Sequence, residues 1–74
     1  MVTNKSYDEI QTIVIENIKK YRKAKYISQE KLGELSNLHR TYIGAVERKE
    51  KNITLKALTQ IANALNIKLV DFLK

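Results

Sequence analysis

Apolar residues recur at helical spacing near the start of the chain. Four of them, spaced 4, 4 and 3 residues apart, share one face of a helix: Ile10, Val14, Ile18 and Tyr21. Ser6 precedes this series and can cap the helix, while Glu9 can bond back to the Ser6 N–H. We therefore predict a frayed end over residues 1–5 and then a long helix that runs to about Lys25.

Two short helices joined by a tight turn are predicted in the stretch SQEKLGELSNLHRTYIGAVER. Ser28 can cap the first of them, which ends at Leu35. Asn37 then tolerates the left-handed backbone that a tight helix exit needs. The second helix follows from about His39 or Arg40 to the end of the stretch.

Gly33 falls in the middle of the first short helix, where glycine costs stability. Close packing is a reason to keep it, because a Cβ at this position would hold the second helix away. Two short helices around an Asn turn and one small residue form a helix-turn-helix pattern.

The remainder of the chain predicts two further helices. Thr54 can cap a helix over Leu55–Leu65 that ends at Asn66, and a last short helix covers Leu69–Leu73. The first of these should bury a stripe of Leu55, Leu58, Ala62 and Leu65. No strand alternation of useful length is present. The prediction is an all-α fold, a compact five-helix bundle with a helix-turn-helix, in one domain over residues 1–74.

The amino-acid composition limits the kinds of metal, disulfide and catalytic site that the chain can form. The 74 residues include no cysteine and a single histidine, His39, so disulfides and Cys-based metal sites are excluded and we expect no metal and no cofactor. The sequence offers no Gly-rich phosphate loop and no motif that links a nucleophile to a base, which argues against an enzyme.

Charge points to a polyanionic partner. The formal net charge is +6 with 30% charged residues, which favours nucleic acid beside a helix-turn-helix. No apolar run approaches a membrane span, and the N-terminus lacks the apolar core of a signal peptide. We expect a cytoplasmic protein without a membrane partner.

The central stretch resembles the phage-repressor-like (Xre-type) helix-turn-helix family, whose domain is of the lambda-repressor type. Six residues fall where that family has its apolar, small, turn and core residues: Leu32, Gly33, Asn37, Leu38, Ile43 and Val46. Within the family, LHRTYIGAVER followed by KNITL is most similar to the controller proteins of restriction-modification systems. The resemblance covers roughly residues 14–73.

This resemblance implies a sequence-specific DNA-binding transcriptional regulator that activates or represses transcription, or does both. Double-stranded DNA is then the main partner. The alternative is an antitoxin-type or phage-type repressor whose main partner is a toxin or another protein.

The second helix of the motif supplies the candidate base-reading residues, because a helix enters the major groove with its N-terminal residues nearest the base edges. Arg40 can pair bidentately with guanine O6 and N7; its alternative role is a phosphate contact. Thr41 can offer a methyl group to thymine or a hydroxyl to base or phosphate, or it can merely fill the helix. Tyr42 can reach the DNA backbone or pack on the neighbouring helix. Ala45 faces the groove in this family.

Five residues are candidate phosphate contacts. In the family, the position of Gln29 places its side chain and backbone N–H groups on a phosphate, and Asn52 matches a second phosphate-contacting region. His39 is most simply an N-cap or a phosphate donor. Lys49 and Lys51 can add charge beside Asn52 or face water.

The family resemblance also assigns two pairs of charged residues. Glu47 matches a glutamate that pairs with an arginine on the first helix, here Arg22, and we predict a partly buried ion pair. Glu30 and Glu34 match the acidic positions through which some phage repressors contact the sigma subunit of RNA polymerase. A solvated helix face is the competing explanation for these two glutamates.

Three positions depart from the family pattern. Tyr26 and Lys49 stand where glycine is common, and Ile53 stands where proline is common. A non-glycine residue in the left-handed region is unusual. The helix exit at Tyr26 is therefore either strained or slightly different, and the loop conformation around Lys49 and Ile53 stays open.

The end of the chain predicts a homodimer. One reading helix contacts too few base pairs to select a single genomic site, so paired half-sites are expected on a pseudo-palindromic operator. The terminal segment holds more apolar residues than its own core needs, and some of them should meet a second copy across a two-fold axis: Ile67, Leu69, Val70, Phe72 and Leu73.

Overall fold

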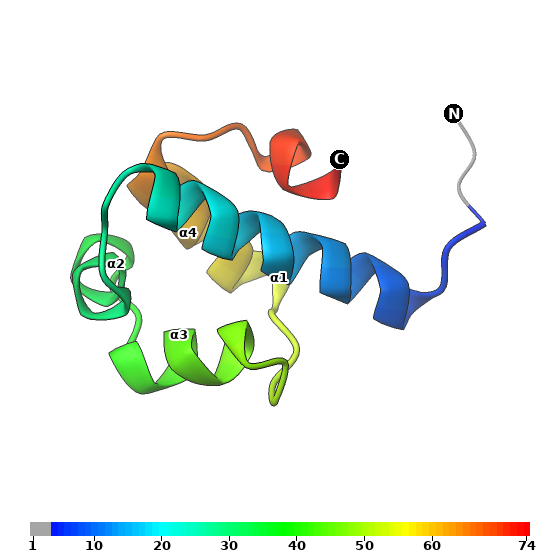
Figure 1. The fold of residues 1–74 in the computed structure, drawn as a ribbon, viewed down its shortest axis with the longest axis horizontal. Helices are drawn as coiled ribbons and strands as arrows, with labels where there is room; N and C mark the ends of the chain where they lie inside the picture. The colour runs from blue at the N-terminus through cyan, green and yellow to red at the C-terminus, as the bar shows by residue number, and fades with distance from the viewer. Residues whose placement is uncertain (1–3) are drawn as a thin grey trace.

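A computed structural model describes residues 4–74 of the chain, and no strand occurs among them (Figure 1). The predicted fraying of residues 1–5 therefore lies mostly outside the described residues. The elements are four α-helices followed by a short 3-10 helix: α1 Tyr7–Ala24, α2 Gln29–Ser36, α3 Arg40–Glu47, α4 Leu55–Leu65 and η1 Leu69–Leu73.

The last element corrects the prediction of five α-helices. Leu69–Leu73 forms a 3-10 helix, in which the Asp71 N–H donates to the Lys68 carbonyl three residues earlier at 2.9 Å. A segment of five residues can form very few of the i→i−4 bonds that define an α-helix, and 3-10 geometry is common in such short pieces. Lys68 also offers no side-chain cap.

The predicted caps set the starts of the α-helices. Ser6 accepts from the Glu9 N–H at 3.2 Å, and the Glu9 carboxylate accepts from the Ser6 N–H at 3.1 Å, which confirms the capping box. Ser28 caps α2 through the Lys31 N–H at 2.9 Å, and Thr54 caps α4 in the same way at 3.0 Å.

Left-handed residues end these helices or follow them closely. Asn37 and Asn66 end α2 and α4 with φ values of 59° and 56°, as the sequence predicts. Tyr26 and Lys49 adopt the same conformation, with φ values of 57° and 63°. The backbone at these two positions therefore keeps the left-handed turn that glycine would take, although a Cβ makes this turn less favourable by roughly 1–2 kcal/mol.

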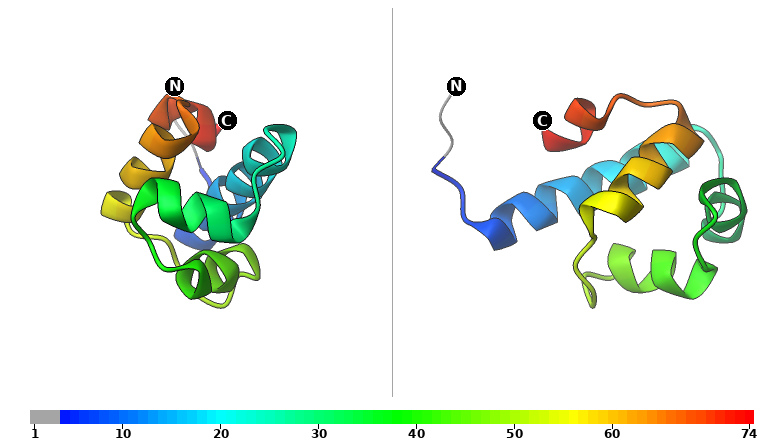
Figure 2. Two further views of the ribbon diagram at one scale, coloured as in Figure 1. Left: turned by 90° about the vertical axis from the view of Figure 1, so that its left-hand side faces the viewer. Right: turned by 180° about the vertical axis from the view of Figure 1, so that it is seen from behind.

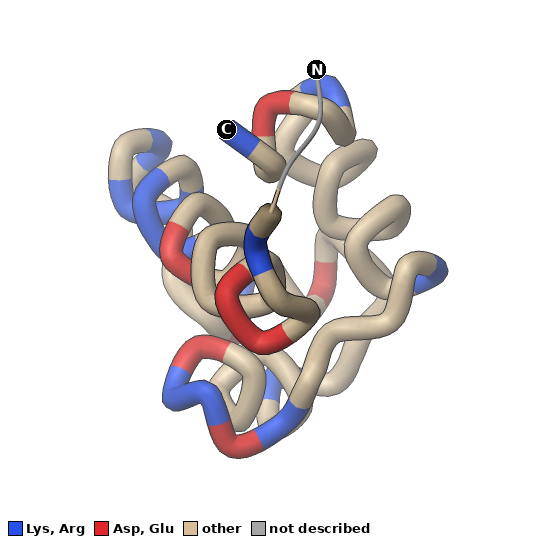
Figure 3. The backbone as a smooth tube through the Cα atoms, turned by 90° about the vertical axis from the view of Figure 1, so that its right-hand side faces the viewer, with Lys and Arg blue, Asp and Glu red and all other residues tan. Residues whose placement is uncertain are grey.

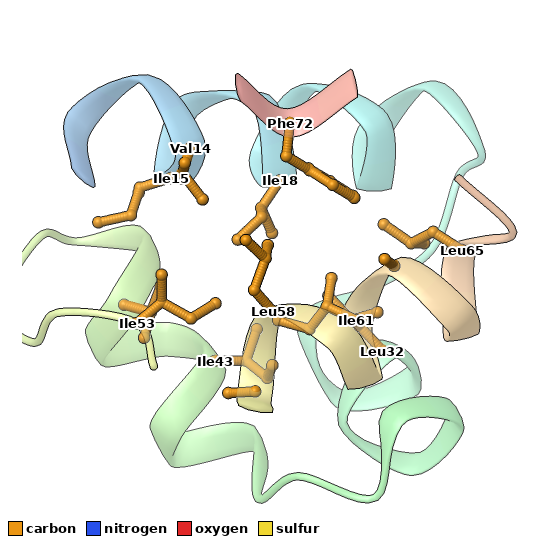
Figure 4. Close-up of a cluster of buried hydrophobic side chains, with 13 residues drawn as sticks. Val14, Ile15, Ile18, Leu32, Ile43, Ile53, Leu58, Ile61, Leu65 and Phe72 are labelled. Atoms are coloured by element: carbon orange, nitrogen blue, oxygen red, sulfur yellow. The ribbon is translucent and has the colours of Figure 1, made fainter. Parts of the chain in front are cut away.

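One apolar cluster joins all five elements. Figure 4 shows Phe72 of η1 against α1, with Ile61 and Leu65 of α4 approaching from the other side. Phe72 is fully buried, and its ring forms a T-shaped contact with the ring of Tyr21, with 5.5 Å between the centroids. Leu55 is an exception to the predicted stripe of α4: it is 71% exposed at the first position of the helix, whereas Leu58 is buried.

The arrangement places the two motif helices on one side of the molecule. In Figures 1 and 2, α1 crosses the whole structure, η1 returns along it, and α2 and α3 lie beyond its C-terminal half. The α2 helix packs against both α3 and α4, while α1 packs most closely against η1. The outer side of α3 is therefore left at the edge of the molecule.

Gly33 sets the approach of α3 to α2. An ideal Cβ at this position would lie 2.6 Å from the Leu38 carbonyl oxygen and 3.2 Å from the Arg40 backbone nitrogen. Both contacts are with backbone atoms, so any larger residue would push the start of α3 away. The packing reason for this glycine is confirmed.

Candidate nucleic-acid interface

The inward face of α3 is fixed by two apolar residues. Ile43 and Val46 are each 1% exposed, and this burial turns the opposite face of the helix outward. Arg40 and Thr41 are exposed at the N-terminal end, and Ala45 is half-buried one turn later. Two of the predicted base-reading residues, Arg40 and Thr41, are thus accessible, and Ala45 lies at the margin of the same surface.

Arg40 is paired in the free chain. Its guanidinium group forms an ion pair with the Glu30 carboxylate of α2, and the two side chains are 66% and 63% exposed. An ion pair in such open surroundings contributes roughly 0–1 kcal/mol. Arg40 can therefore leave Glu30 for a stronger partner at little cost.

His39 caps the helix. Its Nδ1 accepts a hydrogen bond from the Thr41 N–H at 3.0 Å, which satisfies one free donor of the first turn. The N-cap interpretation of this residue is confirmed. Its other ring nitrogen can still donate outward, toward the end of the exposed face.

Tyr42 faces the following loop more than the open surface. Its hydroxyl accepts from the Thr54 N–H at 3.4 Å, and the Lys51 ammonium lies 5.8 Å from its ring centroid. The side chain is half-buried. Packing and a contact at the DNA backbone are both compatible with this placement.

A buried network ties α3 to α1. The Arg22 Nε atom donates to Glu47 Oε2 at 2.7 Å, its Nη2 donates to Oε1 at 2.8 Å, and its Nη1 donates to the Ile27 carbonyl at 2.8 Å. The predicted ion pair is confirmed and is almost wholly buried, with side-chain exposures of 10% and 2%. Gln29 donates to the same carboxylate at 3.0 Å, so its amide is already engaged within the chain.

The network changes the titration of Glu47. Burial alone would raise the pKa of this carboxyl, but hydrogen bonds from Arg22 and Gln29, aided by the nearby positive charge, outweigh it. The pKa of Glu47 therefore lies below its ordinary value of 4.5, and the group is ionised at neutral pH. An arrangement of this kind stabilises geometry and offers no proton donor for catalysis.

The remaining phosphate candidates lie on the loop between α3 and α4, where basic and acidic segments alternate (Figure 3). Lys49 forms an ion pair with Glu16 of α1 at 3.0 Å. Lys51 lies over the Tyr42 ring, and Asn52 is exposed. The five phosphate candidates thus fall into two groups, at the starts of α2 and α3 and on this loop.

The predicted dimer residues divide by burial. Phe72 lies inside the core of its own chain, and Ile67 and Leu69 are half-buried. Val70 and Leu73 point outward, with 53% and 49% of their surfaces exposed. Only these last two offer a substantial apolar surface to a second copy.

Sequence reasoning missed Gln11. Its side-chain amide contacts the backbone of Ile53, 42 residues away, with both its oxygen and its nitrogen. No local pattern marks such a contact, because it depends on how the α3–α4 loop returns to α1. Within residues 4–74 no group of His, Asp or Glu could hold a metal ion, and no helix is long and apolar enough to cross a membrane.

Comparison with known proteins adds a family and several relatives. The helix-turn-helix family model matches residues 18–72. Control protein C.SmaI of Serratia marcescens is 55% identical over 58 residues, which cover 78% of this chain and 69% of the relative. Control protein C.BamHI of Bacillus amyloliquefaciens is 43% identical over 47 residues, covering 64% of this chain and 58% of its own.

Among solved structures, the restriction-modification controller protein C.AhdI from Aeromonas hydrophila superposes with a TM-score of 0.80. It is 35% identical, and the match covers 89% of this chain and 98% of that one. The described fold is therefore shared along nearly its whole length with a protein of known structure.

Proposed function

This chain belongs to the helix-turn-helix family, among the restriction-modification controller proteins, and we propose that it regulates transcription by binding a pseudo-palindromic operator as a homodimer. The carrying observation is the outer face of α3, which is accessible and has Arg40 and Thr41 at its N-terminal end. A helix presented in this way fits the major groove.

We assign base reading to Arg40, Thr41, Tyr42 and Ala45. Arg40 has the strongest support, because it is exposed and its present partner is an exposed carboxylate. Its planar fork matches guanine O6 and N7, whereas a lysine lacks that geometry. Tyr42 and Ala45 are half-buried and would contribute at the margin of the contact.

Phosphates would be held on either side of this helix. Gln29 and His39 stand at the starts of α2 and α3, where free backbone N–H groups favour an anion. Lys49, Lys51 and Asn52 form the second group on the following loop. The formal net charge of +6 supports the same polyanionic partner.

The homodimer would form through the C-terminal segment. Val70 and Leu73 are apolar and exposed, and covering them against a second copy would also place two reading helices about 34 Å apart, one turn of DNA. Sedimentation of the protein at micromolar concentration tests this arrangement. A mass that stays monomeric with and without operator DNA would refute it.

Substitution of Arg40 tests the base-reading assignment. A footprint on DNA flanking the protein's own gene first locates the operator. Arg40→Ala should then cost about 1–3 kcal/mol on the operator and relax the preference at one base position per half-site. Arg40→Lys is the matched control, because it keeps the charge and loses the fork. An equal loss on operator, single-base variants and random DNA would assign Arg40 to phosphate instead.

Recruitment of RNA polymerase would involve the exposed acidic residues of α2. Glu30 also pairs with Arg40, so its substitution would disturb DNA binding as well. Glu34 is exposed and is the cleaner probe. If the patch contacts the sigma subunit, Glu34→Gln should reduce activation while operator affinity stays the same; unchanged activation would leave Glu34 as a solvated residue.

A further inference from the structure

Gln11 holds the backbone of Ile53 at two points. Its Oε1 accepts from the Ile53 N–H at 3.0 Å, and its Nε2 donates to the Ile53 carbonyl at 3.2 Å. The same Nε2 donates to the Tyr7 hydroxyl one turn earlier on α1 at 2.9 Å. One side-chain amide therefore pairs with both backbone groups of a residue on the α3–α4 loop, much as a neighbouring strand would.

The Ile53 backbone needs such a partner. Ile53 is 6% exposed, and it belongs to a segment outside any helix, so no repeating ladder satisfies its N–H. A buried N–H without an acceptor is costly. Gln11 supplies that acceptor from the part of α1 that precedes the matched span of residues 18–72.

A second contact fixes the other end of the loop. Lys49 has a left-handed backbone and forms an ion pair with Glu16, which lies on α1 about one and a half turns after Gln11. Lys49 and Ile53 are thus both joined to α1, and the exposed Lys51 and Asn52 lie between them. In Figure 1 the loop runs below the middle of α1.

We propose that Gln11 is a positioning residue for DNA binding, which holds the Lys49–Ile53 loop in the conformation that meets the phosphates. The inference rests on the proposed function, in which this loop contacts DNA. A loop that is ordered before binding loses less conformational entropy when it meets the duplex. Glu16 assists through Lys49, and Gln11 fixes the loop backbone at Ile53.

The first test is Gln11→Met, which keeps the length of the side chain and removes both hydrogen bonds to Ile53 together with the one to Tyr7. A random-sequence duplex is the probe, because phosphate contacts do not depend on sequence. We expect the Kd to rise roughly 3- to 10-fold, as the loss of two side-chain hydrogen bonds would suggest. The slope of log affinity against log salt should also fall by up to about one unit.

Gln60→Met is the matched control. It removes one amide-to-backbone hydrogen bond, from Gln60 to the Ser36 carbonyl at 2.9 Å, at a site away from the loop. It should lower stability without changing the salt slope. Gln11→Asn is the alternative variant if Gln11→Met does not fold. It keeps the amide but shortens the side chain by one methylene, and it must show the same loss of affinity.

Ile53→Pro supplies a rescue test. Proline has no N–H and fixes its own φ angle, so the loop would lose the donor that Gln11 satisfies. In the double variant Gln11→Met/Ile53→Pro, part of the lost affinity should return. The same duplex affinity for wild type and Gln11→Met would overturn the inference and leave the proposed function standing. A wild-type protein that does not bind DNA would overturn the proposed function itself.

Discussion

Two arginine–glutamate pairs in this chain have the same chemistry and opposite surroundings. Arg22 and Glu47 are buried, joined by two short hydrogen bonds, and each has an additional partner inside the protein. Arg40 and Glu30 are both exposed, and the structure describes a single ion pair between them. The first pair is part of the fold, whereas the second leaves its arginine available to an external partner.

Burial explains the difference. Two charges removed from water must satisfy each other, so a buried pair is costly to break even where a wholly apolar substitute would be tolerated. An exposed charge exchanges its partner for water with little change in free energy. The buried Arg22–Glu47 pair therefore holds the inner side of α3 against α1. The exposed pair on the outer side leaves Arg40 free to bind another partner.

Of the substitutions in the two ion pairs, we expect the one at Glu47 to lower the free energy of unfolding most. Glu47→Gln would leave the buried Arg22 charge without a carboxylate, and we expect the free energy of unfolding to fall by about 3–5 kcal/mol. Urea unfolding at neutral pH measures this change. A loss comparable to that of an exposed substitution would show that the network is not important for stability.

Acidification should weaken the same pair without mutation. Because the pKa of Glu47 is lowered in the folded chain, its contribution is complete above the ordinary value of 4.5 and is lost as the pH falls through the folded value. Stability should therefore decrease at acidic pH. The pKa values of Glu9 and Glu50 are also lowered, chiefly by hydrogen bonds from Ser6 and Arg48, and add to this trend.

The Glu47→Gln variant separates these contributions. It should show a shallower loss of stability with falling pH than the wild type, because the other lowered carboxyls remain in both proteins. Urea unfolding repeated across the acidic range provides the measurement. Identical slopes for the two proteins would exclude Glu47 as a source of the acid sensitivity.

The smallest effect is expected at the exposed pair. Glu30→Gln should change the free energy of unfolding by less than about 1 kcal/mol, since solvent and salt already screen this interaction. The measurement is urea unfolding beside Glu47→Gln under the same conditions. A loss as large as that of Glu47→Gln would remove the distinction between the two pairs.

Local chemistry made much of this fold predictable. The caps at Ser6, Ser28 and Thr54 and the left-handed turns at Asn37 and Asn66 depend on neighbouring residues, and all of them are present. The family resemblance also assigned the Arg22–Glu47 pair. These features are encoded within a few residues or within a recognisable motif.

Features that depend on packing were harder to predict. The apolar spacing of η1 did not distinguish an α-helix from a 3-10 helix. Helical periodicity wrongly predicted that Leu55 is buried, because a periodic pattern does not show where the core ends. No local pattern marked Gln11, because its partner Ile53 lies 42 residues away. At the candidate site, the sequence identified the outward face of α3 but did not indicate that Arg40 pairs with Glu30 in the free chain.

The contact between α1 and η1 determines when the hydrophobic core can be completed during synthesis. Asn17 donates to the Phe72 carbonyl at 2.8 Å across 55 positions of the chain, and Phe72 itself completes the core on that side. Contacts between α2 and α3 span far shorter loops and form with less entropic cost. On the ribosome, the helix-turn-helix can therefore assemble first, while the part of α1 that η1 covers stays exposed until residue 72 has left the exit tunnel.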